Sequence, residues 1–287
     1  MMDINSFGIL GGDKRQAALA ESLAADGCTV YAWGLDRLPL SEDVRRSRLE
    51  EIVSRCMTII LPLPVTVDGK TLNAPYSGET LALDDSFAGL MQHKEVYGGR
   101  MAKLFATSSL WDTAEAYDYY TREEFAVRNA GVTAEAAVAI AVREYEGSLI
   151  GGRCLVAGYG RIGRALASLL RGMGAQVTVS ARRPRDMAWI EISGCRAVQT
   201  EKLGEGEEPY DVVFNTIPAL VFPKRVLSRL KPGCLVIDLA SAPGGVDFAA
   251  AEKLGIRTVH ALSLPGKVSP RAAGEIIKQT IYNMMEE

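Results

Sequence analysis

The sequence contains few residues of the kinds that bind metals. Histidine occurs only twice, as His93 and His260, and the five cysteines are scattered without a CxxC pair. Structural zinc sites need several such ligands at short spacings, so a Cys/His zinc site is not expected. We predict no metal cofactor and interpret the cysteines as buried structural thiols.

Long apolar runs and an excess of charge of one sign are also missing. No apolar run approaches the roughly 20 residues of a membrane span, and the first residues, MMDI, do not resemble a signal or transit peptide. The 32 basic and 35 acidic side chains are mixed along the chain, so no basic face for nucleic acid is predicted. We expect a cytoplasmic protein that binds neither membranes nor nucleic acids.

The pattern of strands and helices predicts an α/β protein with two Rossmann-like doubly wound domains and a cleft between them, because 287 residues suffice for two cores. Residues 1–130 are assigned to a substrate-side α/β domain and residues 131–269 to an NAD(P)-binding Rossmann domain. The helix at 270–287 is in a position to pack back on the first domain. An alanine-rich helix, 134–145, is expected to connect the two.

A nucleotide-binding turn follows a short apolar strand at 153–157. The turn reads GYGRIG, in which Gly158 permits the tight bend, Gly160 lets a pyrophosphate approach and Gly163 lets the helix at 161–172 pack closely. The order of strand, glycines and helix predicts a dinucleotide site. The residues predicted to bind the cofactor are Gly158, Tyr159, Gly160, Arg161, Ile162, Gly163, Ser180, Arg182, Arg183, Asn215, Thr216, Pro218, Leu239 and Ala240.

The end of the next strand favours NADP over NAD. An NAD site usually has an acidic residue there to accept a hydrogen bond from the ribose 2′-hydroxyl, but this strand ends in Ser180, Ala181, Arg182 and Arg183. Two adjacent guanidiniums suit a 2′-phosphate. The alternative is that an arginine stacks on the adenine or faces solvent, in which case NAD is the cofactor.

The first domain begins in a similar way but lacks the same motif. Its first strand, 6–10, ends in Gly11, Gly12 and Asp13, without the third glycine and with charges where a pyrophosphate would lie. A second dinucleotide is therefore not expected, and the charged turn is better suited to a polar substrate. Further along, residues 103–107 are predicted to form a weak strand. A helix is predicted to begin at 112–115.

Five motifs together resemble the dipicolinate synthase A family of spore-forming bacteria. They are GGDKRQ at 11–16, NAGVTAE at 129–135, GYGRIG at 158–163, DLASAPGG at 238–245 and LPGK at 264–267. The nucleotide half alone is also similar to 2-hydroxyacid dehydrogenases, alanine dehydrogenase and methylene-tetrahydrofolate dehydrogenase.

The resemblance implies an NAD(P)-dependent oxidoreductase subunit of dipicolinate synthase that acts with a second, flavoprotein-like subunit, dipicolinate synthase B. Its substrate would be dihydrodipicolinate from the lysine pathway, or the hydrated tetrahydro form. Its product would be pyridine-2,6-dicarboxylate, made in the mother cell during sporulation. A homo-oligomer is left open.

A dicarboxylate substrate needs cations and fixed N–H donors around it. We expect Arg15 on the first domain and Lys267 on the second to bind its carboxylates from opposite sides. His260 is the candidate general base because histidine titrates near neutrality, although a lone histidine at a strand end is often structural. The predicted substrate-binding residues are Gly11, Gly12, Asp13, Arg15, Ser241 and Lys267.

Two other functions remain open at this stage. The chain could be a dehydrogenase of another small carboxylate, such as a 2-hydroxyacid or an amino acid, although such a hydroxyacid enzyme would be expected to pair a histidine with a carboxylate. It could also be a non-catalytic regulatory or assembly subunit that binds a dinucleotide. Reduction of NADP with and without a flavoprotein partner would separate these functions.

Overall fold

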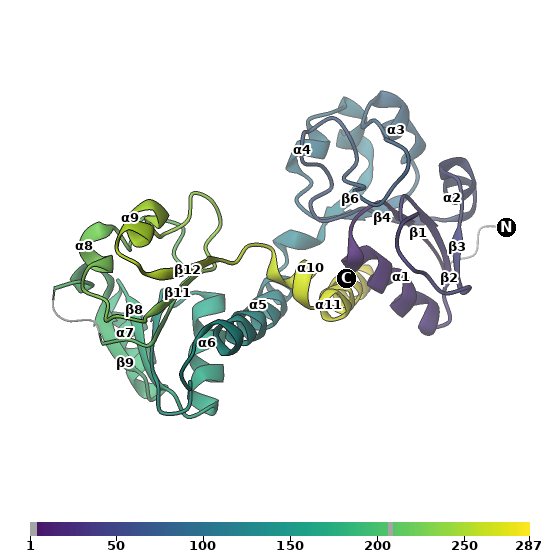
Figure 1. The fold of residues 1–287 in the computed structure, drawn as a ribbon. Coiled ribbons are helices and arrows are strands. Elements are labelled where there is room, and N and C mark those ends of the chain that lie inside the picture. Colours follow the sequence, from purple (N-terminus) through teal and green to yellow (C-terminus); the bar gives the residue numbers. More distant parts are fainter. Residues whose placement is uncertain (1–4, 206–208) are drawn as a thin grey trace. The chain divides into compact units, whose positions relative to one another are not determined.

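The computed structural model describes residues 5–205 and 209–287, which form two compact units (Figure 1). Unit 1 extends to Asn129 and also contains Gly266–Glu287. Unit 2 is Ala130–Pro265. The boundaries predicted from the sequence, 130 and 269, lie close to these.

Unit 1 is built on a six-stranded parallel sheet in the order β3-β2-β1-β4-β5-β6. This is the order of a doubly wound nucleotide-binding fold, which places the carboxyl ends of β1 and β4 side by side. The strands are β1 (Ser6–Leu10), β2 (Thr29–Trp33), β3 (Val44–Arg46), β4 (Thr58–Ile60), β5 (Glu95–Gly98) and β6 (Glu115–Asp118).

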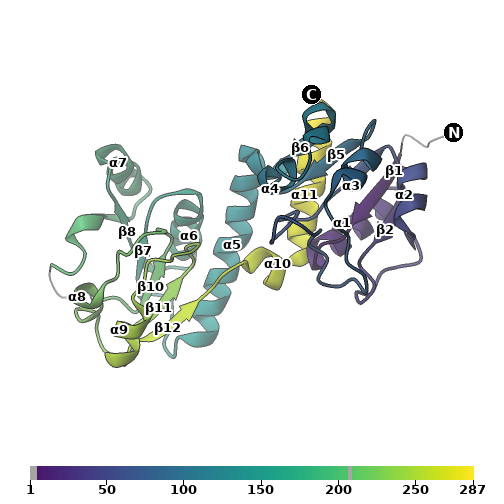
Figure 2. The ribbon, with the colours of Figure 1, turned by 90° about the horizontal axis from the view of Figure 1, so that it is seen from above.

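Helices cover this sheet, and the carboxyl-terminal helix packs along the first one (Figure 2). Gly274 lies so close to α1 that an added Cβ atom would be 2.7 Å from the carbonyl oxygen of Arg15. The helical segments of unit 1 are α1 (Lys14–Ala25), α2 (Leu49–Arg55), α3 (Asp85–Leu90), α4 (Ala102–Phe105), η1 (Ser109–Thr113), η2 (Tyr119–Thr121) and α11 (Pro270–Met285).

Two predictions for unit 1 are wrong. Residues 103–107 do not form a strand, because the chain turns into the short helix α4 and buries Leu104 alone between two exposed neighbours. The helix predicted to begin at 112–115 is a 3₁₀ turn followed by β6, where Tyr117 stacks on Tyr97 with ring centroids 5.4 Å apart. In both places tertiary packing overrides a weak local pattern.

Unit 2 has the same strand order around its own first strand, β12-β11-β10-β7-β8-β9, and every pair is parallel. The predicted doubly wound α/β class is confirmed. The strands are β7 (Arg153–Ala157), β8 (Gln176–Ala181), β9 (Arg196–Gln199), β10 (Val212–Asn215), β11 (Leu235–Asp238) and β12 (Arg257–His260).

The sheet of unit 2 is buried on both faces. Alternate residues of β7 belong to different clusters, with Val156 packed beneath α6 on one face and Leu155 beneath α8 on the other. The helical segments are α6 (Arg161–Gly172), α7 (Pro184–Ile192), η3 (Thr200–Lys202), α8 (Lys224–Leu227), α9 (Phe248–Lys253) and α10 (Leu264–Val268), of which α10 crosses into unit 1.

One helix, α5 (Glu123–Glu144), joins the two units along the chain. The sequence predicted a connecting helix at 134–145, but the helix begins at Glu123 and runs through Gly131 and Thr133. An internal glycine costs about 1 kcal/mol, and burial of the alanine face against the sheet of unit 2 offsets this. Within the part of the chain that is described, α5 is the helix whose length and hydropathy would suit a membrane span, and that buried face accounts for its apolar character.

Candidate functional site

The GYGRIG turn has the geometry that a pyrophosphate site requires. Gly158 follows β7 with φ of +101°, and an added Cβ atom there would lie 2.5 Å from Thr216 Oγ1. An added Cβ at Gly163 would lie 2.1 Å from the carbonyl oxygen of Gly158, so α6 packs on the turn only because Gly163 has no side chain. At Gly160 an added Cβ would meet nothing within 4 Å. This middle position is therefore open to a ligand rather than needed for packing.

Helix α6 starts directly at this open position. Gly160 is its N-cap and provides no side-chain hydrogen bond, so the first N–H groups of a 12-residue helix face the turn. Beside them the Arg164 guanidinium lies 4.9 Å from the centre of the Tyr159 ring. This combination favours an anionic ligand.

A cavity of about 410 Å³ opens in front of the turn. Among the described residues, four arginines and one aspartate line it, so it suits a ligand with several negative charges. Its lining residues are Gly158, Tyr159, Gly160, Arg164, Ala181, Arg182, Arg183, Arg185, Asp186, Thr200, Thr216, Ile217 and Pro218.

The cavity brings together part of the predicted set. Gly158, Tyr159, Gly160, Arg182, Arg183, Thr216 and Pro218 line it. The prediction missed Arg164, Ala181, Arg185, Asp186, Thr200 and Ile217. Arg185 and Asp186 could have been found by following the chain beyond Arg183 into the first turn of α7. Thr200 follows a different strand, and nothing in its local sequence indicates the site.

Ser180 and the first turn of α6 do not line the cavity. Ser180 is fully buried, and its hydroxyl is engaged with Thr200, whose Oγ1 donates to Ser180 Oγ at 3.2 Å. Arg161 is exposed and Ile162 packs against the core of unit 2. Gly163, as its packing shows, serves the fold rather than contacting the cavity.

Asn215 is also directed away from the cavity. Its side chain is fully buried, donates to Asp238 Oδ1 at 2.8 Å and to the Ile217 carbonyl at 3.0 Å, and accepts from Ile217 N at 3.1 Å. The amide therefore has no donor left for a ligand and instead shapes the segment that lines the cavity. Leu239 and Ala240 are buried at the end of β11 and lie outside the lining.

In unit 1, the Gly11–Gly12 turn does not offer free backbone donors. Both residues have positive φ, +64° and +97°. The Gly11 N–H donates to the Trp33 carbonyl and the Gly12 N–H to the Asn73 carbonyl, both at 2.8 Å. The expectation that these amides bind a substrate carboxylate is therefore corrected, because internal acceptors occupy them.

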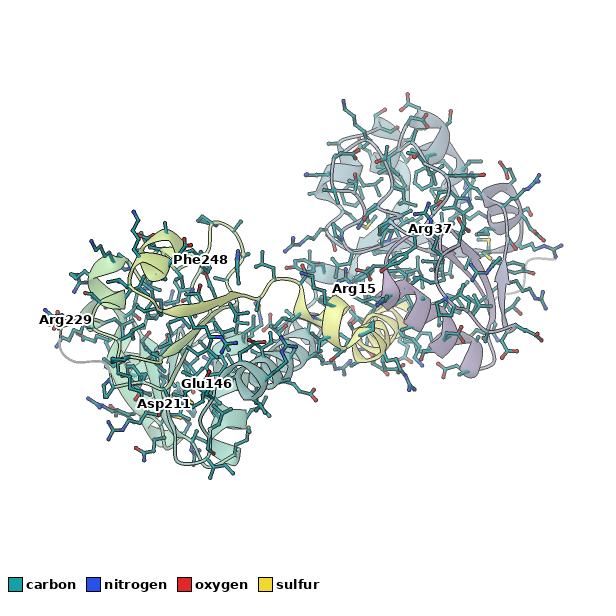
Figure 3. All side chains as sticks on the ribbon, viewed as in Figure 1. Arg15, Arg37, Glu146, Asp211, Arg229 and Phe248 are labelled. Atoms are coloured by element: carbon teal, nitrogen blue, oxygen red, sulfur yellow. The ribbon has the colours of Figure 1, made fainter. Side chains whose placement is uncertain are left out.

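Asp13, the N-cap of α1, forms an ion pair with Arg15 in the first turn of that helix; Figure 3 labels Arg15. Asp13 caps the helix by accepting from Arg15 N at 2.9 Å, and Arg15 Nη2 donates to Asp13 Oδ2 at 2.8 Å and to the Leu63 carbonyl at 2.5 Å. Burial opposes the charge of Arg15, but the hydrogen bonds and charge of Asp13 outweigh it and raise the pKa of the guanidinium. Arg15 is thus a permanently charged but partly engaged cation.

Lys267 is not on the second domain as predicted. It belongs to the segment that unit 1 includes from Gly266 onward, because Gly266 packs on Arg15, with an added Cβ 3.0 Å from Arg15 Nε. Lys267 itself is exposed at the end of α10. Arg15 and Lys267 are therefore residues of the same unit, and the predicted arrangement on opposite domains is wrong.

The remaining predicted residues are exposed in unit 2. His260 ends the edge strand β12, and its ring centroid lies 5.0 Å from that of Phe248, a residue of α9 that Figure 3 labels. Among the described residues it has no carboxylate partner. Ser241 is exposed in a turn in which the Gly244 N–H donates to its carbonyl at 2.9 Å.

The cysteines and acids do not assemble a metal site or a nucleophile within residues 5–205 and 209–287. No group of three His, Cys, Asp or Glu side chains there could hold a metal ion. Burial raises the pKa of the Cys56 thiol to about 11 and of the Cys154 and Cys234 thiols to about 12. These thiols are poor nucleophiles at neutral pH.

The two units match the profiles of different protein families. Residues 6–116 match the profile of the N-terminal domain of dipicolinate synthase A. Residues 125–251 match that of the D-isomer specific 2-hydroxyacid dehydrogenase NAD binding domain. Unit 2 therefore contains a nicotinamide dinucleotide-binding domain of dehydrogenase type.

Solved structures with low identity have the same fold. A transhydrogenase from Sinorhizobium meliloti superposes with a TM-score of 0.68 at 16% identity, covering 97% of this chain and 93% of that one. An L-alanine dehydrogenase superposes with a TM-score of 0.62 at 14% identity, covering 98% and 88%. At these identities the likeness concerns the fold alone.

Whole-chain relatives share one description. Dipicolinate synthase A of Bacillus subtilis (strain 168) is 29% identical over 282 residues, 97% of this chain and 95% of that protein. The crystal structure of dipicolinate synthase A from Bacillus halodurans superposes with a TM-score of 0.86 at 29% identity, covering 100% of both chains. The crystal structure of the protein from Bacillus subtilis superposes with a TM-score of 0.85 at 28% identity, covering 100% of this chain and 97% of that one. The resemblance predicted from the sequence is thus confirmed: the chain is similar to dipicolinate synthase A along nearly its whole length.

Proposed function

We propose that the chain is the NADP-dependent oxidoreductase component of a dipicolinate synthase, which oxidises dihydrodipicolinate or its hydrated tetrahydro form to pyridine-2,6-dicarboxylate. The observation that supports the dinucleotide most directly is the cavity in front of GYGRIG, with its four guanidiniums. The similarity of the whole chain to dipicolinate synthase A supports the substrate.

The residues of the cavity fit a nicotinamide dinucleotide. The open space at Gly160 and the N-terminus of α6 suit the pyrophosphate, and Arg182 and Arg183 suit a 2′-phosphate. Thr216 to Pro218 would form the opposite wall. When bound, the nicotinamide supplies the acceptor for a hydride.

Two cations of unit 1 are proposed to bind the substrate carboxylates. Arg15 uses Nε and Nη2 for Asp13 and Leu63, while within the described residues its Nη1 makes no hydrogen bond. Lys267 is exposed and has no ion-pair partner among the same residues. Each therefore keeps donor capacity for an anion, and Asp13 holds the Arg15 side chain in a fixed position.

The proton released on oxidation needs an acceptor, and His260 is the residue we propose for this step. Its ring is exposed and lies beside that of Phe248, tilted by 37° to it, and a histidine in such a position can accept a proton. Ser241, exposed after β11, is proposed to add a hydroxyl to the substrate site.

The chain is proposed to act in the cytoplasm of the mother cell of a sporulating bacterium, together with the flavoprotein-like dipicolinate synthase B. These assignments follow from the resemblance. Whether the chain also forms a homo-oligomer does not affect the reaction proposed.

The test is the reduction of NADP by the purified chain, with chemically generated dihydrodipicolinate, in the presence and absence of dipicolinate synthase B. NADPH formation in either mixture, together with dipicolinate measured by chromatography, is the expected result. Tight NADP binding without turnover in both mixtures would instead favour a non-catalytic role in dinucleotide binding. Turnover of a 2-hydroxyacid or amino acid, and none of dihydrodipicolinate, would show that the chain is a dehydrogenase of that other substrate.

A further inference from the structure

Among the residues that the structure describes, Asp186 is the one acidic residue that lines the cavity in unit 2. It lies in the first turn of α7, beyond the strand end where an acidic residue would be expected. Its side chain is only 19% exposed, and the nearest cation, Arg185 Nε, is 3.7 Å away, too far for a good hydrogen bond. Within residues 5–205 and 209–287 the carboxylate accepts no hydrogen bond.

A carboxylate in this state has unused acceptor capacity. Ionised carboxylates accept several hydrogen bonds, and partly desolvated ones are normally satisfied by donors. An acid in the first turn of a helix interacts favourably with the helix dipole. That explanation applies equally to a solvent-facing acid and does not account for a mostly buried Asp186 in the lining of a cavity that four arginines also line.

The chemistry of a dinucleotide indicates what Asp186 would contact. Phosphates at neutral pH offer acceptors, which suit the guanidiniums and are repelled by a carboxylate. The donors of the adenosine half are the adenine amino group and the ribose hydroxyls, and of these only the 2′-hydroxyl is replaced by a phosphate in NADP. A carboxylate beside Arg182 and Arg183 therefore favours a free 2′-hydroxyl over a 2′-phosphate, against the preference of the arginines.

We infer that Asp186 accepts a hydrogen bond from the 2′-hydroxyl of the adenosine ribose and sets how strongly the site discriminates between NADP and NAD. This inference rests on the proposed dinucleotide function of the cavity. Asp186 supports the binding of NAD, and the arginines support the binding of NADP. The balance between these two effects sets the ratio of the NADP affinity to the NAD affinity.

The inference is tested by measuring the dissociation constants of NAD and NADP for Asp186→Asn by calorimetric titration at one fixed salt concentration. Losing a charge-assisted hydrogen bond should weaken NAD about 10-fold or more. NADP should not weaken with it, because a repulsion is removed at the same time. The dissociation constant of NAD divided by that of NADP should therefore rise about 10-fold.

A matched control is Glu191→Gln, which removes the same charge from an exposed position of α7 outside the cavity. Its ratio should equal that of the unaltered protein. An unchanged ratio in Asp186→Asn would overturn the inference. An equal loss of both affinities would overturn it as well, because it would assign Asp186 to the stability of α7. If the unaltered protein bound neither dinucleotide, the proposed function itself would fail.

Discussion

Asn215 Nδ2 donates a hydrogen bond of 2.8 Å to Asp238 Oδ1 at the carboxyl ends of β10 and β11, and both side chains are fully buried. Asp238 also accepts from Ala240 N at 3.1 Å and Gly245 N at 2.9 Å. The side chain of Asn215 in turn forms hydrogen bonds with the backbone N–H and the backbone carbonyl of Ile217. The pair therefore links the loop after β11 to the segment that lines the cavity.

Asp238→Asn is expected to destabilise unit 2 and weaken dinucleotide binding. The amide presents one acceptor and an N–H group where two carboxylate oxygens now face three donors. Leaving buried donors unsatisfied costs about 1–3 kcal/mol, so urea denaturation should show a loss of this size. Glu252→Gln, exposed on α9, serves as the control. Equal midpoints for Asp238→Asn and the unaltered protein would contradict this role.

Gly160 and Gly163 of the GYGRIG turn should respond differently to substitution. Gly160→Val is expected to fold normally, because the space around an added Cβ is empty, yet to lose dinucleotide binding. Gly163→Ala is expected to lose about 1–3 kcal/mol of stability, because its Cβ would meet the Gly158 carbonyl oxygen. Thermal unfolding and NADP titration of both variants separate the effects. A folded Gly160→Val protein with full NADP affinity would show that no pyrophosphate binds there.

The double substitution Arg182→Ala with Arg183→Ala is expected to abolish most of the preference for NADP over NAD. Charge-assisted hydrogen bonds are worth about 1.5–3 kcal/mol each, with the lower end applying to these exposed side chains. NAD affinity should change little. Arg225→Ala with Arg229→Ala removes the same charge from an exposed part of unit 2 and should leave both affinities unchanged (Figure 3). Equal affinities of the unaltered protein for NADP and NAD would refute the assignment.

The strands of unit 2 could be predicted because buried parallel strands are short apolar runs separated by glycine and proline. In unit 1 the strand β3, Val44–Arg46, was missed because it has three residues and two of them are exposed arginines. The continuity of α5 was missed because Gly131 and Thr133 are typical of helix ends, and only tertiary packing explains their place inside a helix.

The prediction of the sites was limited mainly by unknown hydrogen-bond partners of side chains, and less by errors in the predicted backbone structure. The sequence showed Asp13 and Arg15 as neighbouring charges, but not that each satisfies the other. It showed Asn215 at a strand end, but the partner that turns it inward, Asp238, is 23 residues further along. Hydrogen bonds between distant segments decide which polar side chains remain available to a ligand, and local spacing does not contain that information.

The docking of α11 on α1 should depend on pH through Lys278 and Asp26, which are 2.7 Å apart. The hydrogen bond from Lys278 lowers the pKa of Asp26. Burial opposes the charge of Lys278, but hydrogen bonds to Asp26 and Glu275 outweigh it and raise its pKa. A lowered carboxyl pKa stabilises the fold above about pH 4, and a raised ammonium pKa stabilises it below about pH 10.

Lys278→Met is accordingly expected to lower the free energy of unfolding at pH 7 by about 1 kcal/mol or less, because Asp26 is partly exposed. The difference from the unaltered protein should shrink as the pH falls below that at which Asp26 is protonated. Lys70→Met, at an exposed lysine of unit 1, should show no such pH dependence. A Lys278→Met effect that stayed constant from neutral to acid pH would assign the loss to packing rather than to the ion pair.

Lys267→Ala is expected to raise the apparent KM for the dicarboxylate about 10-fold, since a hydrogen bond to a charged group is worth about 1.5–3 kcal/mol. NADP affinity should stay unchanged, because Lys267 is not among the residues that line the cavity. Lys70→Ala controls for the loss of one positive charge from unit 1. The measurement is a pair of titrations on each variant, one with substrate and one with NADP. A Lys267→Ala protein that lost NADP affinity but kept its KM would place this lysine at the phosphates and refute its role in binding the substrate.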